Sequence, residues 1–246
     1  MKYTFDFSFL PGESLRSHDC RIVVDLLRAS SQIVTFFDCG GEVLLPLGEV
    51  GEAFELRDTL GDEWKLMGER GGRAPEGFDI GNSPSVLSAT GAPAKAIMTT
   101  SNGTRAITRA AADCKQVLVG CARNAEAVAW DALCRGADID IIASGRNGGF
   151  SMEDTVCAGM LTELLLALAP KNGAESIELT DGAIAASALW RYFGRDLEAV
   201  SMESEHGRNL QELGFAADIR FCCEAGASAV VPRISVQNGL YTITAG

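Results

Sequence analysis

Residues 21–27 read R-I-V-V-D-L-L, and this stretch decides the fold class. It is an apolar run that ends beside a carboxylate, and a helical pattern follows it over residues 30–38. A continuous apolar run of this length is typical of a strand that is buried on both faces. A buried strand followed by a helix is the repeating unit of a parallel sheet covered by helices.

The same pairing recurs on both sides of this stretch. Further strands are predicted at residues 3–9, 42–46, 64–68, 95–99, 116–120, 139–144, 218–222, 229–231 and 240–244. Further helices are predicted at residues 49–59, 103–112, 124–134, 153–168, 181–193 and 204–213. We therefore predict an α/β fold, a three-layer α/β/α body with a mostly parallel central sheet and an antiparallel C-terminal edge.

Length and composition limit the organisation and the function. The 246 residues predict one domain, 1–246, with two closely packed α/β halves as the alternative. The net charge of −12 argues against a nucleic-acid partner, which would need a basic surface. No apolar run approaches the ~20 residues that a bilayer requires, and residues 1–10 lack the pattern of a signal peptide. We therefore expect a cytoplasmic protein with no membrane partner.

The cysteines predict no metal knuckle and no redox motif. None of the eight lies in a C-x-x-C pattern, and most have apolar or small neighbours. Such cysteines are typical of buried, reduced thiols in an intracellular protein.

Polar motifs follow the predicted strands at their carboxyl ends. Asp25, the segment 69–73, the segment 99–105 and the segment 144–148 each follow a strand. Ligands of parallel sheets bind at this edge. We therefore expect these segments to form one site.

Arginine is the preferred cation of this edge. The chain has 16 arginines and five lysines, and five of the arginines fall in the strand-end loops. A guanidinium binds phosphate, sulfonate or carboxylate with two parallel hydrogen bonds. Ion pairing with neighbouring acids is the structural alternative for each arginine. The catalytic candidates are Asp25, Arg28, Arg105 and Arg146.

The glycine-containing loops S-N-G-T-R and S-G-R-N-G precede predicted helices. Free backbone N–H groups at a helix start bind anions, although glycine is also common in such loops for steric reasons. The substrate-binding candidates are Ser30, Arg70, Asn82, Asn102, Gly103, Thr104, Asn147 and Gly148. No P-loop and no dinucleotide-binding glycine pattern is present.

The acids in these loops predict a hard divalent cation, and Mg²⁺ suits carboxylates combined with an anionic ligand. The candidate ligands are Asp25, Glu69, Glu153 and Asp154. Glu153 and Asp154 are adjacent on a helix, so one of them is alternatively a helix cap. His206 and His18 are expected to be a surface and a loop histidine without a role in the site.

Six ordered motifs together resemble the 2-phosphosulfolactate phosphatase family. They are VVDLLRASSQIVT at 23–35, GERGG at 68–72, EGFDIGNSP at 76–84, TTSNGTRA at 99–106, SGRNG at 144–148 and EDTVCAG at 153–159. The resemblance implies an α/β fold distinct from the common phosphatase folds. It also implies Mg²⁺-dependent hydrolysis of 2-phospho-3-sulfolactate to 3-sulfolactate and phosphate, a step toward coenzyme M. The partner is then a small anionic phosphorylated substrate, and self-association into a homo-oligomer stays open.

The residues do not contain the common phosphoenzyme motifs. No D-x-D-x-[TV], C-x₅-R or R-H-G occurs. Direct attack by a metal-positioned water is therefore the simpler mechanism, with a covalent role for Asp25 as the alternative. Two other functions stay open, namely a phosphatase of the same fold for another small phospho-acid and a non-catalytic anion-binding module.

Overall fold

The computed structural model describes residues 1–13, 16–193 and 195–245. The strands within these residues form one sheet in the order β4-β5-β3-β10-β9-β6-β2-β7-β1-β8. They are β1 Lys2–Ser8, β2 Cys20–Val24, β3 Val43–Leu47, β4 Trp64–Gly68, β5 Lys95–Thr99, β6 Val117–Gly120, β7 Asp138–Ala143, β8 Ser176–Leu179, β9 Pro232–Gln237 and β10 Leu240–Ala245. The helices are α1 Ala29–Asp38, α2 Val50–Leu60, α3 Pro84–Thr90, α4 Gly103–Ala111, α5 Ala125–Arg135, α6 Met152–Leu168, α7 Asp181–Tyr192, α8 Leu197–Glu203, α9 Glu205–Glu212 and α10 Ala216–Cys223, with a short 3₁₀ helix at Ala169–Asn172.

The predicted α/β class and the mostly parallel sheet are confirmed. Strands β6, β2, β7, β1 and β8 form one parallel group, and β4, β5 and β3 form another. The C-terminal strands are antiparallel as predicted, but they lie in the interior of the sheet and not at its edge. The β9–β10 hairpin joins the two groups, because β10 pairs with β3 and β9 pairs with β6. The hairpin thereby pairs with the inner edge strand of each group, β3 and β6, which would otherwise be open.

Helices pack on both faces of the sheet. The largest apolar cluster joins β1, β2 and β7 to α5, α6 and α7. A second cluster joins the sheet to α1 and α4, and a smaller third cluster packs α2 on β3, β4 and β5. The buried strands β2, β6 and β7 are mostly apolar because they contact such clusters, and Arg21 and Asp140 are their buried charged exceptions.

The C-terminal third departs from the predicted elements. Residues 218–222 belong to α10 and are not a strand, and residues 229–231 are in no strand. The segment is helical because Asp218, Ile219 and Cys222 share one buried face at helical spacing. The sequence also did not reveal α3, α8, β8 or β9. These elements are short, and their tertiary partners stabilise them more than their own pattern does.

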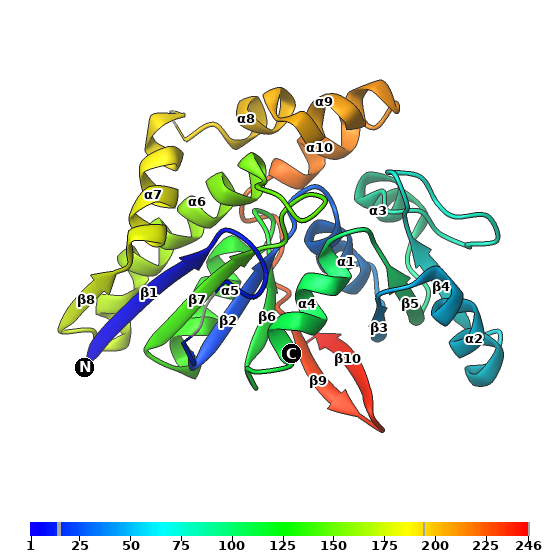
Figure 1. Ribbon diagram of the computed structural model, residues 1–246, viewed down its shortest axis with the longest axis horizontal. Coiled ribbons are helices and arrows are strands. Elements are labelled where there is room, and N and C mark those ends of the chain that lie inside the picture. Colours follow the sequence, from blue (N-terminus) through cyan, green and yellow to red (C-terminus); the bar gives the residue numbers. More distant parts are fainter. Residues whose placement is uncertain (14–15, 194, 246) are drawn as a thin grey trace.

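The chain segments that follow β2, β4, β5 and β7 meet on one side of the molecule, although β3, β5 and β4 run antiparallel to β6, β2 and β7 across the hairpin. Helices α8, α9 and α10 cross above these strand ends, at the top of the view in Figure 1. The loops that follow the four strands and this helical segment enclose the candidate site.

Candidate active site

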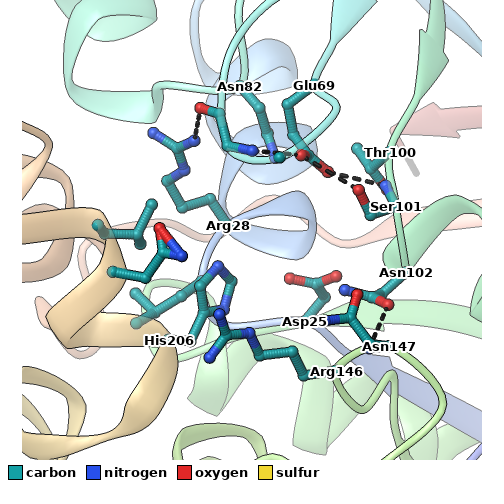
Figure 2. A pocket seen from close by; sticks show the side chains of 15 residues that line it. Asp25, Arg28, Glu69, Asn82, Thr100, Ser101, Asn102, Arg146, Asn147 and His206 are labelled. Atoms are coloured by element: carbon teal, nitrogen blue, oxygen red, sulfur yellow. Dashed lines mark hydrogen bonds between the residues drawn. The ribbon is translucent and has the colours of Figure 1, made fainter. Parts of the chain in front are cut away.

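A cavity of about 170 Å³ lies at these strand ends. A cavity near 150 Å³ accommodates a molecule the size of benzene, so the space suits a small substrate. Its lining is mostly polar (Figure 2) and consists of Asp25, Leu27, Arg28, Glu69, Gly71, Gly72, Asn82, Thr100, Ser101, Asn102, Arg146, Asn147, His206, Asn209 and Leu210. Seven predicted site residues are among them, namely Asp25, Arg28, Glu69, Asn82, Asn102, Arg146 and Asn147.

Asp25 lies directly after β2, and the starts of helices α1 and α4 fix the position of its carboxylate. Its Oδ1 accepts a hydrogen bond from the N–H of Ala29 at 3.0 Å, at the start of α1. A β-carbon on Gly103 would lie 2.6 Å from its Oδ2, so α4 can begin beside this carboxylate only with glycine there. Burial raises the pKa of Asp25 above its ordinary value, while the nearby His206 and the N–H of Ala29 oppose that rise.

Glu69 and Asn82 come from the chain between β4 and α3. The carboxylate of Glu69 accepts hydrogen bonds from the N–H groups of Gly72 and Ser101 at 2.8 and 2.7 Å. Asn82 is 5% exposed, and its Oδ1 has no hydrogen-bond partner among the described residues. A buried acceptor without a partner is costly. Its position in the lining of the cavity therefore indicates a cation or a donor supplied by a ligand.

Two arginines line the cavity, and each is paired. Arg28 donates to Oδ2 of Asp218 and to the carbonyl of Gly72, both at 2.7 Å, and its guanidinium lies over the ring of Phe215. Arg146 lies 2.9 Å from Glu205. Arg28 is thus fixed by buried partners, whereas the partner of Arg146 is 82% exposed.

His206 belongs to the cavity, and its expected surface position is wrong. Helix α9 carries it over the strand ends, where Figure 2 shows it facing the same space as Asp25. Its Nδ1 lies 3.2 Å from Oε1 of Glu153. Burial acts to raise the pKa of Glu153, but the hydrogen bond and charge of His206 outweigh it, and this pKa lies below its ordinary value.

Glu153 and Asp154 are both buried at the start of α6, and neither lines this cavity. The helix cap is Ser151, whose Oγ accepts from the N–H of Asp154. Asp154 Oδ1 accepts from the N–H of Leu26 at 2.9 Å and therefore holds the loop that carries Asp25. Burial, followed by the charges of Asp25 and Glu153, raises the pKa of Asp154 well above its ordinary value.

The other predicted residues lie around the cavity and not in its lining. Arg105 is 58% exposed and pairs with Glu49 at 2.6 Å, because the first turn of α4 directs it outward. Arg70 donates to the carbonyls of Glu69 and Gly48, and so ties two loops together. Ser30 accepts from the N–H of Asp25, Thr104 accepts from the N–H of Thr100, and Gly148 adopts the positive φ of a turn. We expected arginines from all the strand-end loops to meet in this site, but only Arg28 and Arg146 line the cavity.

Sequence reasoning missed several lining residues. Thr100 and Ser101 lie inside the TTSNGTRA motif at 99–106, so their position at the end of a predicted strand was an available signal. His206, Asn209, Leu210 and the buried partner Asp218 lie in the C-terminal segment, where no local pattern indicates a site.

The cysteines and the helices bear on two further expectations, those of reduced thiols and of no membrane span. All eight cysteines are free, and five of them are buried. In the part of the chain that the structure describes, no helix combines the length and the apolar character needed to cross a membrane.

Comparison with known proteins identifies the family. Residues 9–237 match the family model described as 2-phosphosulpholactate phosphatase. The chain belongs to this family. Proteins named "probable 2-phosphosulfolactate phosphatase" are similar over nearly their whole length. The one from Pseudothermotoga lettingae is 35% identical over 92% of this chain and 94% of its own. Those from Synechocystis and Thermus thermophilus are 33% and 36% identical, each over 94% of both chains.

Membership of the 2-phosphosulfolactate phosphatase family confirms the resemblance drawn from the six motifs. It also confirms the predicted enzyme class, a phosphoric monoester hydrolase. The matched region contains every residue that lines the cavity.

Proposed function

We propose that this chain hydrolyses 2-phospho-3-sulfolactate to 3-sulfolactate and phosphate, with Mg²⁺ as its cofactor. The observation that supports the proposal is the convergence of Asp25, Glu69 and Asn82 with Arg28 and Arg146 on one small cavity. Family membership supports the substrate.

The residues of the cavity fit a magnesium ion. Asp25, Glu69 and the amide oxygen of Asn82 offer the hard oxygen ligands that Mg²⁺ takes. The unpartnered Oδ1 of Asn82 is an acceptor that a cation would satisfy. Burial, and after it the charge of the nearby Asp25, raises the pKa of Asp154, so the two carboxyl groups lie close together beside this site. Mg²⁺ at this position would neutralise charge on the phosphoryl oxygens and orient the attacking water.

Arg28 and Arg146 bind the anionic groups of the substrate in this proposal. Because Arg28 is fixed by Asp218 and Gly72, its charge is preorganised and needs no reordering as the reaction proceeds. Asn102 and Asn147 add amide groups from two strand-end loops, and Asn102 Oδ1 accepts from the N–H of Asn147 at 3.0 Å. In this proposal, the amides of Asn102 and Asn147 take the binding role that the sequence predicted for additional arginines.

His206 is positioned to protonate the leaving oxygen. Water attacks phosphorus, the bond between phosphorus and the C2 oxygen breaks, and that oxygen leaves as an alkoxide that needs a proton. His206 faces Asp25 across the cavity, and Glu153 orients its ring through Nδ1. A histidine whose ring is fixed by a carboxylate is an efficient proton donor.

The test compares kcat/KM for phosphosulfolactate, phospholactate and a neutral aryl phosphate. The sulfonate should be recognised by a charged hydrogen bond, worth ~1.5–3 kcal/mol. We therefore expect phospholactate to react at least ~10-fold less efficiently. Equal efficiency would favour a phosphatase for small phospho-acids in general. Phosphate binding without turnover in Mg²⁺ would instead identify an anion-binding module.

A further inference from the structure

A second group of metal-binding side chains lies away from the candidate active site. Asp6 on β1 and Asp140 on β7 are neighbours in the register of the sheet, and Arg21 on β2 is the next neighbour of Asp140. Side chains alternate between the two faces of a strand. These three residues therefore share the face opposite to the one on which Phe5 and Ile139 join the main apolar cluster.

His18 covers this face from the connection between β1 and β2. Its side chain is fully buried, and its Nε2 lies 3.8 Å from Oδ2 of Asp140 and 4.0 Å from Oδ2 of Asp6. One nitrogen and two carboxylate oxygens lie within 4.8 Å of one another. Ligand distances of ~2.1 Å place the ligand atoms of a tetrahedral ion ~3.4 Å apart. Small side-chain shifts would therefore close the group around one ion.

The surrounding contacts hold each ligand in a suitable orientation. His18 Nδ1 lies 2.8 Å from Oδ1 of Asp138, the carboxylate–histidine arrangement that typically fixes a metal-binding imidazole. Oδ1 of Asp6 accepts from the N–H of Phe7 at 2.8 Å and from the hydroxyl of Thr180, which leaves Oδ2 toward His18. Ser8 donates to the carboxylate of Asp140.

An independent observation comes from Arg21. This residue is 4% exposed, and its Nε lies 3.8 Å from Oδ2 of Asp140 without a hydrogen-bond partner among the described residues. The rest of its guanidinium bonds to the carbonyl of Ala110 and to Asp113. A buried donor of this kind requires an acceptor. A water molecule in the coordination shell of an ion on Asp140 would supply it.

The charge balance of the cluster favours a dication. Asp6, Asp138, Asp140 and Asp113 face two guanidinium groups, those of Arg16 and Arg21. In the ion pairs of the described residues, these groups carry two more negative than positive charges, His18 not counted.

We propose that Asp6, His18 and Asp140 form a second metal site that binds a divalent transition-metal ion, with Zn²⁺ as the best fit. One imidazole with two carboxylates suits borderline ions such as Zn²⁺ better than Mg²⁺. The ion would fasten the β1–β2 connection to the sheet. The same connection packs on the loop that carries Arg146, because the ring of Phe9 lies 6.1 Å from that of Phe150 and Leu10 lies beside Gly145. The site is therefore structural, and it supports the active-site loop from outside the cavity.

The experiment titrates Co²⁺ and Zn²⁺ into the metal-stripped full chain in saturating Mg²⁺, followed by calorimetry and by the visible absorption of Co²⁺. We expect one tight ion for each wild-type chain. His18→Gln should weaken it by more than the ~10–100-fold typical of losing an outer partner, and Asp138→Asn should weaken it within that range. If His18→Gln does not fold, Asp6→Asn, which changes a partly exposed ligand, takes its place in the titration.

His206→Gln is the matched control, because the chain has only two histidines. It should leave the tight ion unchanged, with the same stoichiometry and absorption. Loss of the ion in His206→Gln but not in His18→Gln would place it in the active-site cavity and overturn the proposal. Failure of the wild-type chain to bind either ion would show that His18 only forms ion pairs here.

Discussion

The guanidinium of Arg28 and the carboxylate of Asp218 form a buried ion pair at 2.7 Å, although 190 positions separate them in the chain. Oδ1 of the same carboxylate accepts hydrogen bonds from Ser83 and from the backbone and side chain of Ser85, at the start of α3. One acid on α10 thus fixes the cation of the first strand-end loop and the helix that follows Asn82. The C-terminal segment therefore builds part of the candidate active site.

Asp218→Asn should destabilise the fold by ~3–5 kcal/mol, because it leaves the buried charge of Arg28 without its partner. The free energy of unfolding in urea measures this loss. Glu49→Gln is the matched control, since it breaks the exposed pair with Arg105 and should cost at most ~1 kcal/mol. Equal and small losses in both variants would mean that Arg28 is not held by this pair.

Gly103→Ala should lower turnover without unfolding the protein. The added β-carbon would lie 2.6 Å from Oδ2 of Asp25 and 2.4 Å from the β-carbon of Ala29, so it would displace the carboxylate. A displacement near 1 Å typically costs ~10²-fold in rate. Gly51→Ala, in open space on α2, is the control and should leave kcat unchanged. Normal turnover of Gly103→Ala would show that the position of Asp25 is not critical.

His206→Gln should slow hydrolysis of phosphosulfolactate by ~10²–10⁴-fold, the usual contribution of a general acid. An aryl phosphate with an acidic leaving group needs little protonation, so its rate should fall much less. The ratio of the two losses distinguishes proton donation from a general structural effect. Equal losses on both substrates would contradict the assigned role.

Removal of divalent cations should abolish phosphate release, and Mg²⁺ should restore it. The reason is that Asp25, Glu69 and Asn82 line the cavity with carboxylate and amide oxygens, which would suit a hard ion. Phosphate release is measured after dialysis against chelator and after stepwise addition of Mg²⁺. Full activity in excess chelator would exclude the proposed cofactor.

Thiol titration of the denatured, unreduced protein should count eight cysteines, because all eight are free. In the native protein at neutral pH, the exposed Cys134 should react first. Burial raises the pKa of Cys222 well above its ordinary value, so its reactive thiolate is scarce and the group reacts slowly. A native count that reaches eight as fast as the denatured count would contradict the observed burial.

The sequence by itself determined the fold class and one edge of the site. Apolar runs such as residues 21–27 specify buried strands through their own composition. Because parallel strands end at the same edge, the sequence also paired Asp25 with Arg146, after β2 and β7, and Glu69 with Asn102, after β4 and β5. Both inferences depend on local pattern and on a general rule of sheet topology.

Only the tertiary structure decided the rest. The sequence placed the antiparallel C-terminal strands at an edge, but β9 and β10 lie inside the sheet, since long-range pairing selects a strand's neighbours. His206 reaches the cavity because α9 crosses the strand ends, and Arg105 leaves it because one helical turn directs it to solvent. Contacts such as that between Arg28 and Asp218 join distant segments, and no local periodicity encodes which distant residues will meet.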